Sequence, residues 1–296
     1  ADIATWGGAA FDMEEVDDLQ QVSCDFIACG VDPEKVIKWA NENRETAGLQ
    51  IKGQDAPHQD SGAQPMFTVV VPGDKTSEAD GQKHHVGVMP TIKLCIYREA
   101  VRLQGNVNID PLDPKALTHA EVAGMKGAME HLEYLRSVAP GFEGAFIVAQ
   151  GHLGVRESRR VRCEYCLTID DVKGQARFDD VVCLNCRSLD YHLKGTVFKI
   201  SSPPGNHDVP LRSLIPLNID NVVVAGRCIS CDHLAQASLR GAATCMAIGH
   251  AAGVTAALAS RAAGKVRDLD VREIQRTLLA QDAILSTHGR SFDDLA

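Results

Sequence analysis

The stretch that decides the fold runs from residue 221 to residue 259 and reads NVVVAGRCISCDHLAQASLRGAATCMAIGHAAGVTAALA. Its first five residues, 221–225, are mostly β-branched and apolar, which predicts a short strand covered on both faces. A glycine turn follows, and the Ala- and Gly-rich run over about 238–263 predicts a helix that another element approaches closely. In this order of strand, turn and helix, the amino-terminus of the helix points toward any ligand that binds in the loop. Its free amides favour an anion there. From composition alone, a purely structural strand–helix unit remains an open interpretation.

Composition limits the class of protein. The chain has 296 residues, 45% apolar and 23% charged, as in soluble globular proteins with one large domain or two ordinary ones. A net charge of −9 with 5% aromatic residues argues against a nucleic-acid partner. Since no run of about 18 apolar residues occurs, we expect no membrane-spanning helix. The ten cysteines, without an export signal at the start, predict reduced thiols and a cytoplasmic location.

Two local patterns predict where helices begin. Asp32 followed by Pro33 predicts a helix to about residue 45, because Asp caps free amides and Pro suits the first helical position. Thr118 and Glu121 have the spacing of a capping box and predict a helix to about residue 138. Apolar residues recur along this second helix at helical spacing, which predicts an amphipathic helix; they are Val122, Met125, Met129, Leu132 and Leu135.

The deciding stretch resembles the carboxy-terminal end of succinate dehydrogenase-like FAD-dependent oxidoreductases. The matching residues are Ala225-Gly226-Arg227, Ser230, Arg240 and Gly249-His250-Ala251-Ala252-Gly253. The resemblance continues in order through 118–146, GVRESRRV at 154–161, EYCLTIDDV at 164–172, LDYH at 189–192 and VPLRSLIP at 209–216. The start, ADIATWGGAAF, is similar to the segment that comes after the family's Thr-Gly-Asp motif. A collinear match of this extent is more specific than any single motif.

The resemblance implies an α/β fold of the mixed α+β kind. Residues 1–20 would end the FAD-binding region, and 21–209 would form a substrate or cap domain built on a sheet with helices. Residues 210–265 would add the carboxy-terminal strand–helix unit of the FAD-binding domain, and 266–296 a last helix and tail. The G-x-G-x-x-G fingerprint that holds the flavin pyrophosphate does not occur in this sequence. We therefore expect a fragment, a processed product or one subunit, completed by an amino-terminal FAD-binding segment.

The resemblance also implies roles for individual residues. The flavin would be lined by Gly226, Arg227, Ser230, Arg240 and a helix start formed by Gly249, Ala251, Ala252 and Gly253. That helix start would stabilise the negative charge that collects on the reduced flavin. Arg156 and Arg159 could hold a substrate carboxylate or polarise a carbonyl, and His192 could accept a proton. A solvated charge cluster and a structural histidine are the alternatives. The implied reaction is hydride transfer from a small organic substrate to N5 of FAD.

Two pairs of cysteines offer a different interpretation. Cys163-x-x-Cys166 and Cys183-x-x-Cys186 have zinc-ribbon spacing, which predicts a zinc- or iron–sulfur-stapled binding module. Because the collinear match continues through both pairs, we favour buried cysteines without a metal. A non-catalytic subunit is a further alternative. Among partners we expect a small-molecule substrate and the missing FAD-binding segment; an oligomer is open, and neither nucleic acid nor a membrane is expected.

Overall fold

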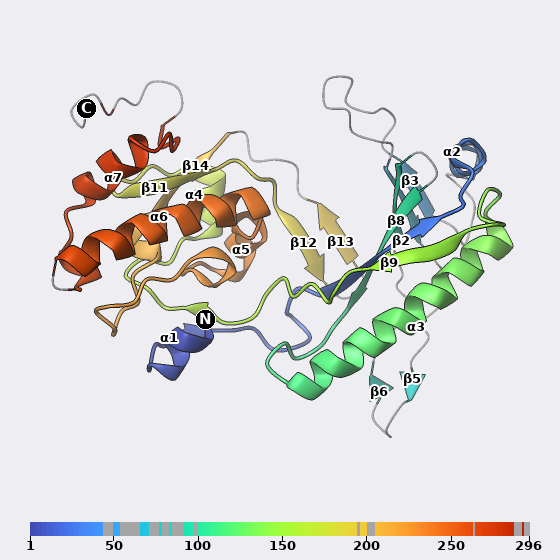
Figure 1. The fold of residues 1–296 in the computed structure, drawn as a ribbon, viewed down its shortest axis with the longest axis horizontal. Helices are drawn as coiled ribbons and strands as arrows, with labels where there is room; N and C mark the ends of the chain where they lie inside the picture. The colour runs from blue at the N-terminus through green and yellow to red at the C-terminus, as the bar shows by residue number, and fades with distance from the viewer. Residues whose placement is uncertain are drawn as a thin grey trace. The chain divides into compact units, whose positions relative to one another are not determined.

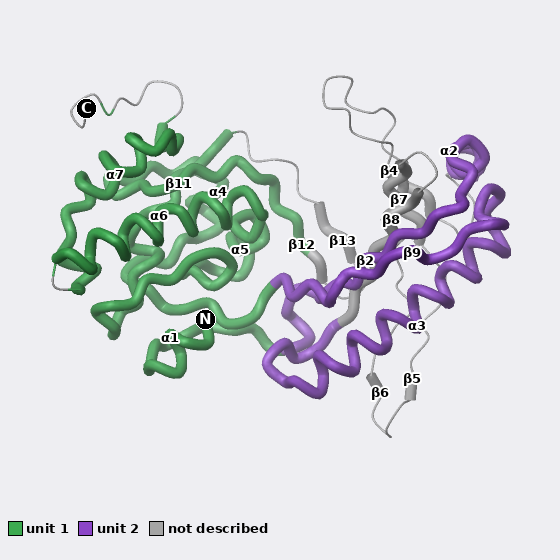
Figure 2. The backbone as a smooth tube through the Cα atoms, viewed as in Figure 1, with its two compact units in different colours: residues 1–15, 157–296 green, residues 16–156 purple. Residues whose placement is uncertain are grey.

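The structure is a computed structural model that describes residues 1–43, 50–53, 66–70, 77–78, 83–84, 92–97, 100–193, 196–199, 205–262, 264–286 and 292. Among residues 50–107 and 192–199 the description covers the backbone alone. The chain divides into two compact units (Figure 2): unit 1 comprises 1–15 and 157–296, and unit 2 comprises 16–156. Helices and antiparallel sheets occur together, which confirms the mixed α/β fold class.

Unit 2 is a six-stranded antiparallel sheet with helices packed on it (Figure 1). The strand order is β3-β4-β7-β8-β2-β9, and α3 contacts β2, β8 and β9. Its elements are β2 (Val22–Cys29), α2 (Pro33–Glu42), β3 (Gln50–Gly53), β4 (Met66–Val70), β5 (Ser77–Glu78), β6 (Lys83–His84), β7 (Ile92–Tyr97), β8 (Ala100–Val107), α3 (Pro114–Val138) and β9 (Phe146–Gln150). Its core packs Phe26 and Ala28 of β2 against Trp39 of α2 and Leu135 of α3.

The two predicted helix starts of unit 2 have different outcomes. Asp32 caps α2 by accepting from the Lys35 amide, with Pro33 in the first turn, so this prediction is confirmed. The capping box at Thr118 is wrong, because α3 begins at Pro114 behind Asp113, whose carboxylate accepts from the Lys115 amide. The same Asp-Pro pair therefore starts both helices.

The exposed side of α3 also differs from the expectation. Leu132 and Leu135 are buried as predicted, together with Ala120, Ala128 and His131. Val122, Met125 and Met129, however, are 49%, 56% and 65% exposed. Small residues define the side that meets the sheet, because a Cβ added at Gly124 would lie 2.4 Å from the Cys24 sulfur. Close approach of the backbone, rather than the apolar spacing, thus sets the buried face.

Unit 1 packs its helices and several short strand pairs around one core (Figure 1). Its elements are α1 (Asp2–Trp6), β1 (Phe11–Asp12), β10 (Arg160–Val161), α4 (Ile169–Gly174), β11 (Val181–Asn185), β12 (Asp190–Leu193), β13 (Thr196–Lys199), β14 (His207–Pro210), the 3₁₀ turns η1 (Leu211–Ser213), η2 (Gly226–Cys228) and η3 (Val266–Asp268), and the helices α5 (His233–Leu239), α6 (Ala242–Arg261) and α7 (Val271–Leu279). Strand pairs β1–β10, β11–β14 and β12–β13 are antiparallel.

The deciding stretch contains its predicted helix but not its predicted strand. Residues 221–225 are not a strand: among described residues, their one backbone–backbone hydrogen bond joins the Val224 amide to the Leu214 carbonyl at 2.9 Å. A strand needs a ladder of such bonds to a neighbouring strand. The helix predicted over about 238–263 is confirmed as α6 (Ala242–Arg261), and the shorter α5 (His233–Leu239) precedes it, with Arg240-Gly241 between the two.

Leu167 makes an isolated bridge with Cys231, and Thr168 then leads into α4. The Thr168 hydroxyl accepts from the Asp171 amide while the Asp171 carboxylate accepts from the Thr168 amide. This reciprocal pair is a capping box. These two short-range hydrogen bonds start the helix at Ile169, although its β-branched side chain favours strand.

The compact units have bounds other than the predicted domains. The structure divides at 15/16 and 156/157, and residues 157–209, assigned from sequence to the substrate domain, belong to unit 1. The functional labels of the predicted domains remain a prediction. Helix α6 is long and apolar enough to cross a membrane by length and composition alone, and the expectation of no membrane-spanning helix stays a prediction. Core helices pass the same test, and α6 contributes Ile248, Ala251 and Val254 to the core of unit 1.

Candidate functional site

The loop between η2 and α5 is held in place by main-chain hydrogen bonds. Gly226 has a φ of +75°, a left-handed conformation that favours glycine and turns the chain after the extended segment. Ser230 is buried, its amide donates to the Ser213 carbonyl, and its carbonyl accepts from the Leu167 amide. Asp232 then caps α5 by accepting from the Ala235 amide. The predicted flavin residues Gly226, Arg227 and Ser230 therefore lie on a fixed loop.

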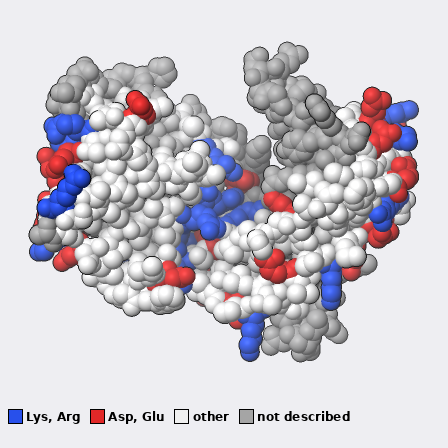
Figure 3. Space-filling view, in the orientation of Figure 1, with Lys and Arg blue, Asp and Glu red and all other residues white. Residues whose placement is uncertain are grey.

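Basic side chains gather around this loop and the start of α6 (Figure 3). The pKa of the Cys245 thiol is raised by burial, and the charges of Arg227, Arg187 and Arg240 act on it in the opposite direction. The Arg240 side chain is 9% exposed and contacts Asp190, donating to its carbonyl oxygen. Burial lowers the pKa of Arg240, and Asp190 opposes that shift. The positive charges of Arg187, Arg227 and Arg240 thus lie near Cys245, in the first turns of α6.

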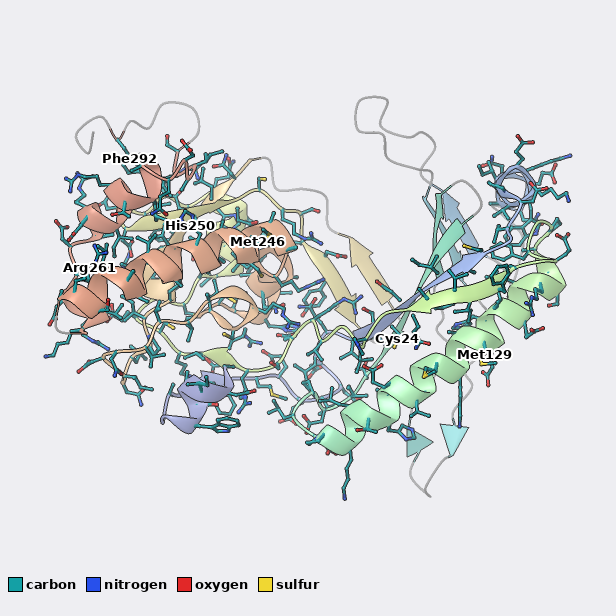
Figure 4. The ribbon with its side chains drawn as sticks, viewed as in Figure 1. Cys24, Met129, Met246, His250, Arg261 and Phe292 are labelled. Carbon is teal, nitrogen blue, oxygen red and sulfur yellow. The ribbon has the colours of Figure 1, made fainter. Side chains whose placement is uncertain are left out.

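The predicted helix start at 249–253 is wrong, because α6 already begins at Ala242 and these residues lie in its interior. Ala251 and Ala252 point into the core, whereas Gly249 and Gly253 are exposed. A Cβ added at either glycine would meet no described atom within 4 Å. Figure 4 shows Met246 and His250 on the same helix, and Met246 is 74% exposed. The exposed side of α6 therefore carries mostly small residues, together with Met246 and His250.

The structure describes the side-chain surroundings of two of the three predicted substrate residues. Arg159 contacts Asp2 and donates to the Thr5 hydroxyl at 3.0 Å, and its guanidinium lies over the Phe11 ring. Arg156 belongs to unit 2, where it is buried and donates to the Gln21 carbonyl. His192 lies in β12, and its side chain is outside the described residues. Their substrate roles remain predictions.

The structure assembles a polar cluster that sequence reasoning left out of the site. Glu157, 1% exposed, accepts from Arg160 and lies 2.8 Å from the Nδ1 of His233. Arg160, 4% exposed, also donates to Glu14 at 2.7 Å and to the Cys231 carbonyl at 3.0 Å. The available signal was the spacing of Glu157 and Arg160 in GVRESRRV, which allows a local ion pair. No local pattern indicates His233, which is 76 residues away.

The ring of His233 is also fixed by packing. Tyr191 of β12 meets it edge to face, with ring centroids 4.8 Å apart. The His233 side chain is 18% exposed, and its Nε2 has no hydrogen-bond partner among the described residues. The imidazole is thus held at one nitrogen and on one face, and its other nitrogen is left for a ligand or water.

The two cysteine pairs do not converge. Cys163 makes an isolated bridge with Pro216 and lies near Cys228, whereas Cys183 lies in β11 near Cys245. Burial raises the pKa of both the Cys163 and the Cys183 thiol to about 12. No group of three or more His, Cys, Asp or Glu residues that could hold a metal ion exists among the described residues. The geometry does not support the alternative site at Cys163, Cys166, Cys183 and Cys186.

Comparison with known proteins places the chain. No curated protein matches the chain significantly. The family described as FAD dependent oxidoreductase matches residues 1–278, which covers both compact units and every element through α7 apart from its last residue. The chain belongs to the FAD-dependent oxidoreductase family.

Proposed function

We propose that the chain forms one wall of an FAD site and takes part in hydride transfer from a small organic substrate to FAD. The family match over residues 1–278 is the observation that carries this proposal, and FAD is the cofactor that the family implies. When bound, FAD supplies the two-electron acceptor for the reaction. The residues of the chain would then bind and orient FAD, and their positive charges would compensate the negative charge of the reduced flavin.

The residues around η2 and α6 fit this group. At Gly226 the nearest described atom to an added Cβ is the Cys245 sulfur at 4.0 Å, so the turn leaves space beside it. Gly249 and Gly253 leave the exposed side of α6 open to a planar ring or to another backbone. Arg227 and Arg240 place positive charge near the start of α6, where helix amides already favour negative charge.

A second polypeptide segment is part of the proposal. The sequence has no G-x-G-x-x-G, and residues 221–225 make a single backbone–backbone hydrogen bond within the described structure. We propose that a segment carrying the fingerprint, in cis or in trans, holds the flavin pyrophosphate. The proposed substrate is a small organic molecule that can lose a hydride. The proposed location is the cytoplasm, because a chain of ten cysteines, of which the described ones are free thiols, suits a reducing compartment.

The test is reconstitution with FAD. The chain alone and the chain combined with its upstream segment are titrated with FAD, and quenching of flavin fluorescence gives the affinity. We expect weak binding by the chain alone and at least a tenfold gain with the segment, about 1.4 kcal/mol of binding free energy.

Arg240→Gln tests the basic cluster in the same titration, and Arg162→Gln is the control because Arg162 pairs with Asp12 in an exposed position. Arg240→Gln should weaken FAD binding and Arg162→Gln should not. A complete chain that shows no FAD binding, or equal affinities for the two variants, would contradict the proposed wall.

A further inference from the structure

We propose that His233 is the proton acceptor of the reaction and that Glu157 is its positioning residue. The inference deepens the proposed function and rests on it. His233 is the first residue of α5, directly after the loop that carries Ser230. The carboxylate of Glu157 lies 2.8 Å from Nδ1, so it can accept the Nδ1 proton.

The pairing fixes the chemistry of the ring. When Nδ1–H donates to a carboxylate, the neutral imidazole carries its lone pair on Nε2. The Nε2 of His233 is therefore the acceptor, and the ring turns little because Tyr191 packs against it. Glu157 is itself held by Arg160, whose three donor groups also reach Glu14 and the Cys231 carbonyl. These contacts fix the direction of the Glu157 carboxylate toward the imidazole.

Four other described histidines lack this arrangement. His131 and His207 are buried, and burial lowers the pKa of each to about 4. His250 bonds to Gln281 through Nε2 at 2.6 Å. His152 also faces a carboxylate, but its Nδ1 is 3.8 Å from Glu121 and its side chain is fully exposed. Of these five histidines, His233 is the one with a carboxylate at 2.8 Å and a nearly buried side chain that keeps one nitrogen without a partner among the described residues.

The step balances with FAD as the oxidant. For an alcohol or amine substrate, the C–H bond breaks and its hydride, with both electrons, goes to the flavin. The O–H or N–H proton goes to Nε2 of His233, and a C=O or C=N bond forms. The substrate is oxidised and the flavin is reduced. Proton transfer to a positioned base typically contributes about 10²–10⁴-fold to the rate.

The first experiment needs neither FAD nor a substrate. Histidine ¹⁵N-labelled chain is studied by NMR in alkaline buffer, and the imidazole shifts report which nitrogen carries the proton. We expect the Nδ1–H form at His233 and a mixture at His152. Glu157→Gln, which keeps an acceptor oxygen, should retain the Nδ1–H form, whereas Glu157→Met should lose it. A protonated Nε2 at His233 in the wild-type chain would overturn the inference.

The second experiment uses the chain completed with its upstream segment and FAD. Anaerobic flavin reduction by a panel of short primary alcohols and amines is followed by loss of flavin absorbance. His233→Gln should slow reduction by about 10²–10⁴-fold and leave FAD affinity unchanged, because the ring is assigned to the proton. His152→Gln is the matched control and should keep the wild-type rate. Equal reduction rates for wild type and His233→Gln would overturn the inference, whereas failure to bind FAD would count against the proposed function instead.

Discussion

Replacing Arg160 by methionine should destabilise unit 1 strongly. The Arg160 side chain is 4% exposed and contacts Glu157, Glu14 and the Cys231 carbonyl. Burial alone lowers the pKa of Arg160, but Glu157 and Glu14 more than offset that effect, so the pKa is raised. The ion pairs therefore outweigh the cost of burial in this state. Methionine fills the space of the stem and leaves the carboxylate of Glu157 buried without its cation.

The magnitude comes from the loss of one partner of a buried pair. Such a loss costs about 3–5 kcal/mol, because the remaining charge stays in a medium that solvates it poorly. Equilibrium urea unfolding, followed by circular dichroism, measures the change. Hydrogen exchange should rise most in the loop from Gly226 to Asp232, since the Cys231 carbonyl loses its donor.

Arg162→Met is the matched control for this prediction. Arg162 follows β10 directly and pairs with Asp12, and both side chains are about half exposed. Exposed pairs contribute little, so this variant should unfold like the wild type. If Arg160→Met were no less stable than Arg162→Met, the buried cluster would not hold the loop, and the reasoning from burial would be refuted.

Two further predictions concern pH and packing. Burial lowers the pKa of His207 from 6.5 to about 4 in the folded chain, so the unfolded chain binds the proton first as pH falls. The contribution of His207 to stability should be full above pH 6.5 and decline toward pH 4 by roughly 3 kcal/mol at 1.36 kcal/mol per unit. Since the pKa of His131 is also lowered to about 4, His207→Asn should remove only its own share of the decline in urea unfolding, and parallel curves would contradict this. Gly124→Ala should cost about 1–3 kcal/mol, because its Cβ would meet the Cys24 sulfur at 2.4 Å. Gly127→Ala in the same helix has open space among described atoms, and equal melting temperatures for the two variants would disprove the close approach.

Local sequence signals succeeded where the interaction lies within one turn of chain. Asp32 and Pro33 start α2 because the cap and its amide are three residues apart. They failed where two local solutions compete: Thr118 could cap a helix, but Asp113-Pro114 starts α3 earlier and leaves Thr118 inside it, donating to the Pro114 carbonyl. The predicted strand at 221–225 failed for another reason, since strand structure depends on a partner strand and not on β-branched residues alone.

The site was predicted unevenly for the same physical reason. The sequence by itself determined the family, the loop from Gly226 to Ser230 and the arginine-rich segment GVRESRRV, because these are patterns of residue type and order. Only the tertiary structure decided which arginine of that segment is buried, and that Glu157 meets His233 across 76 residues. Burial and distance arise when distant segments pack, and they decide whether a charge is solvated or held against a partner. The motif therefore identifies the charged residues, whereas the packing of distant segments determines that Glu157 pairs with His233.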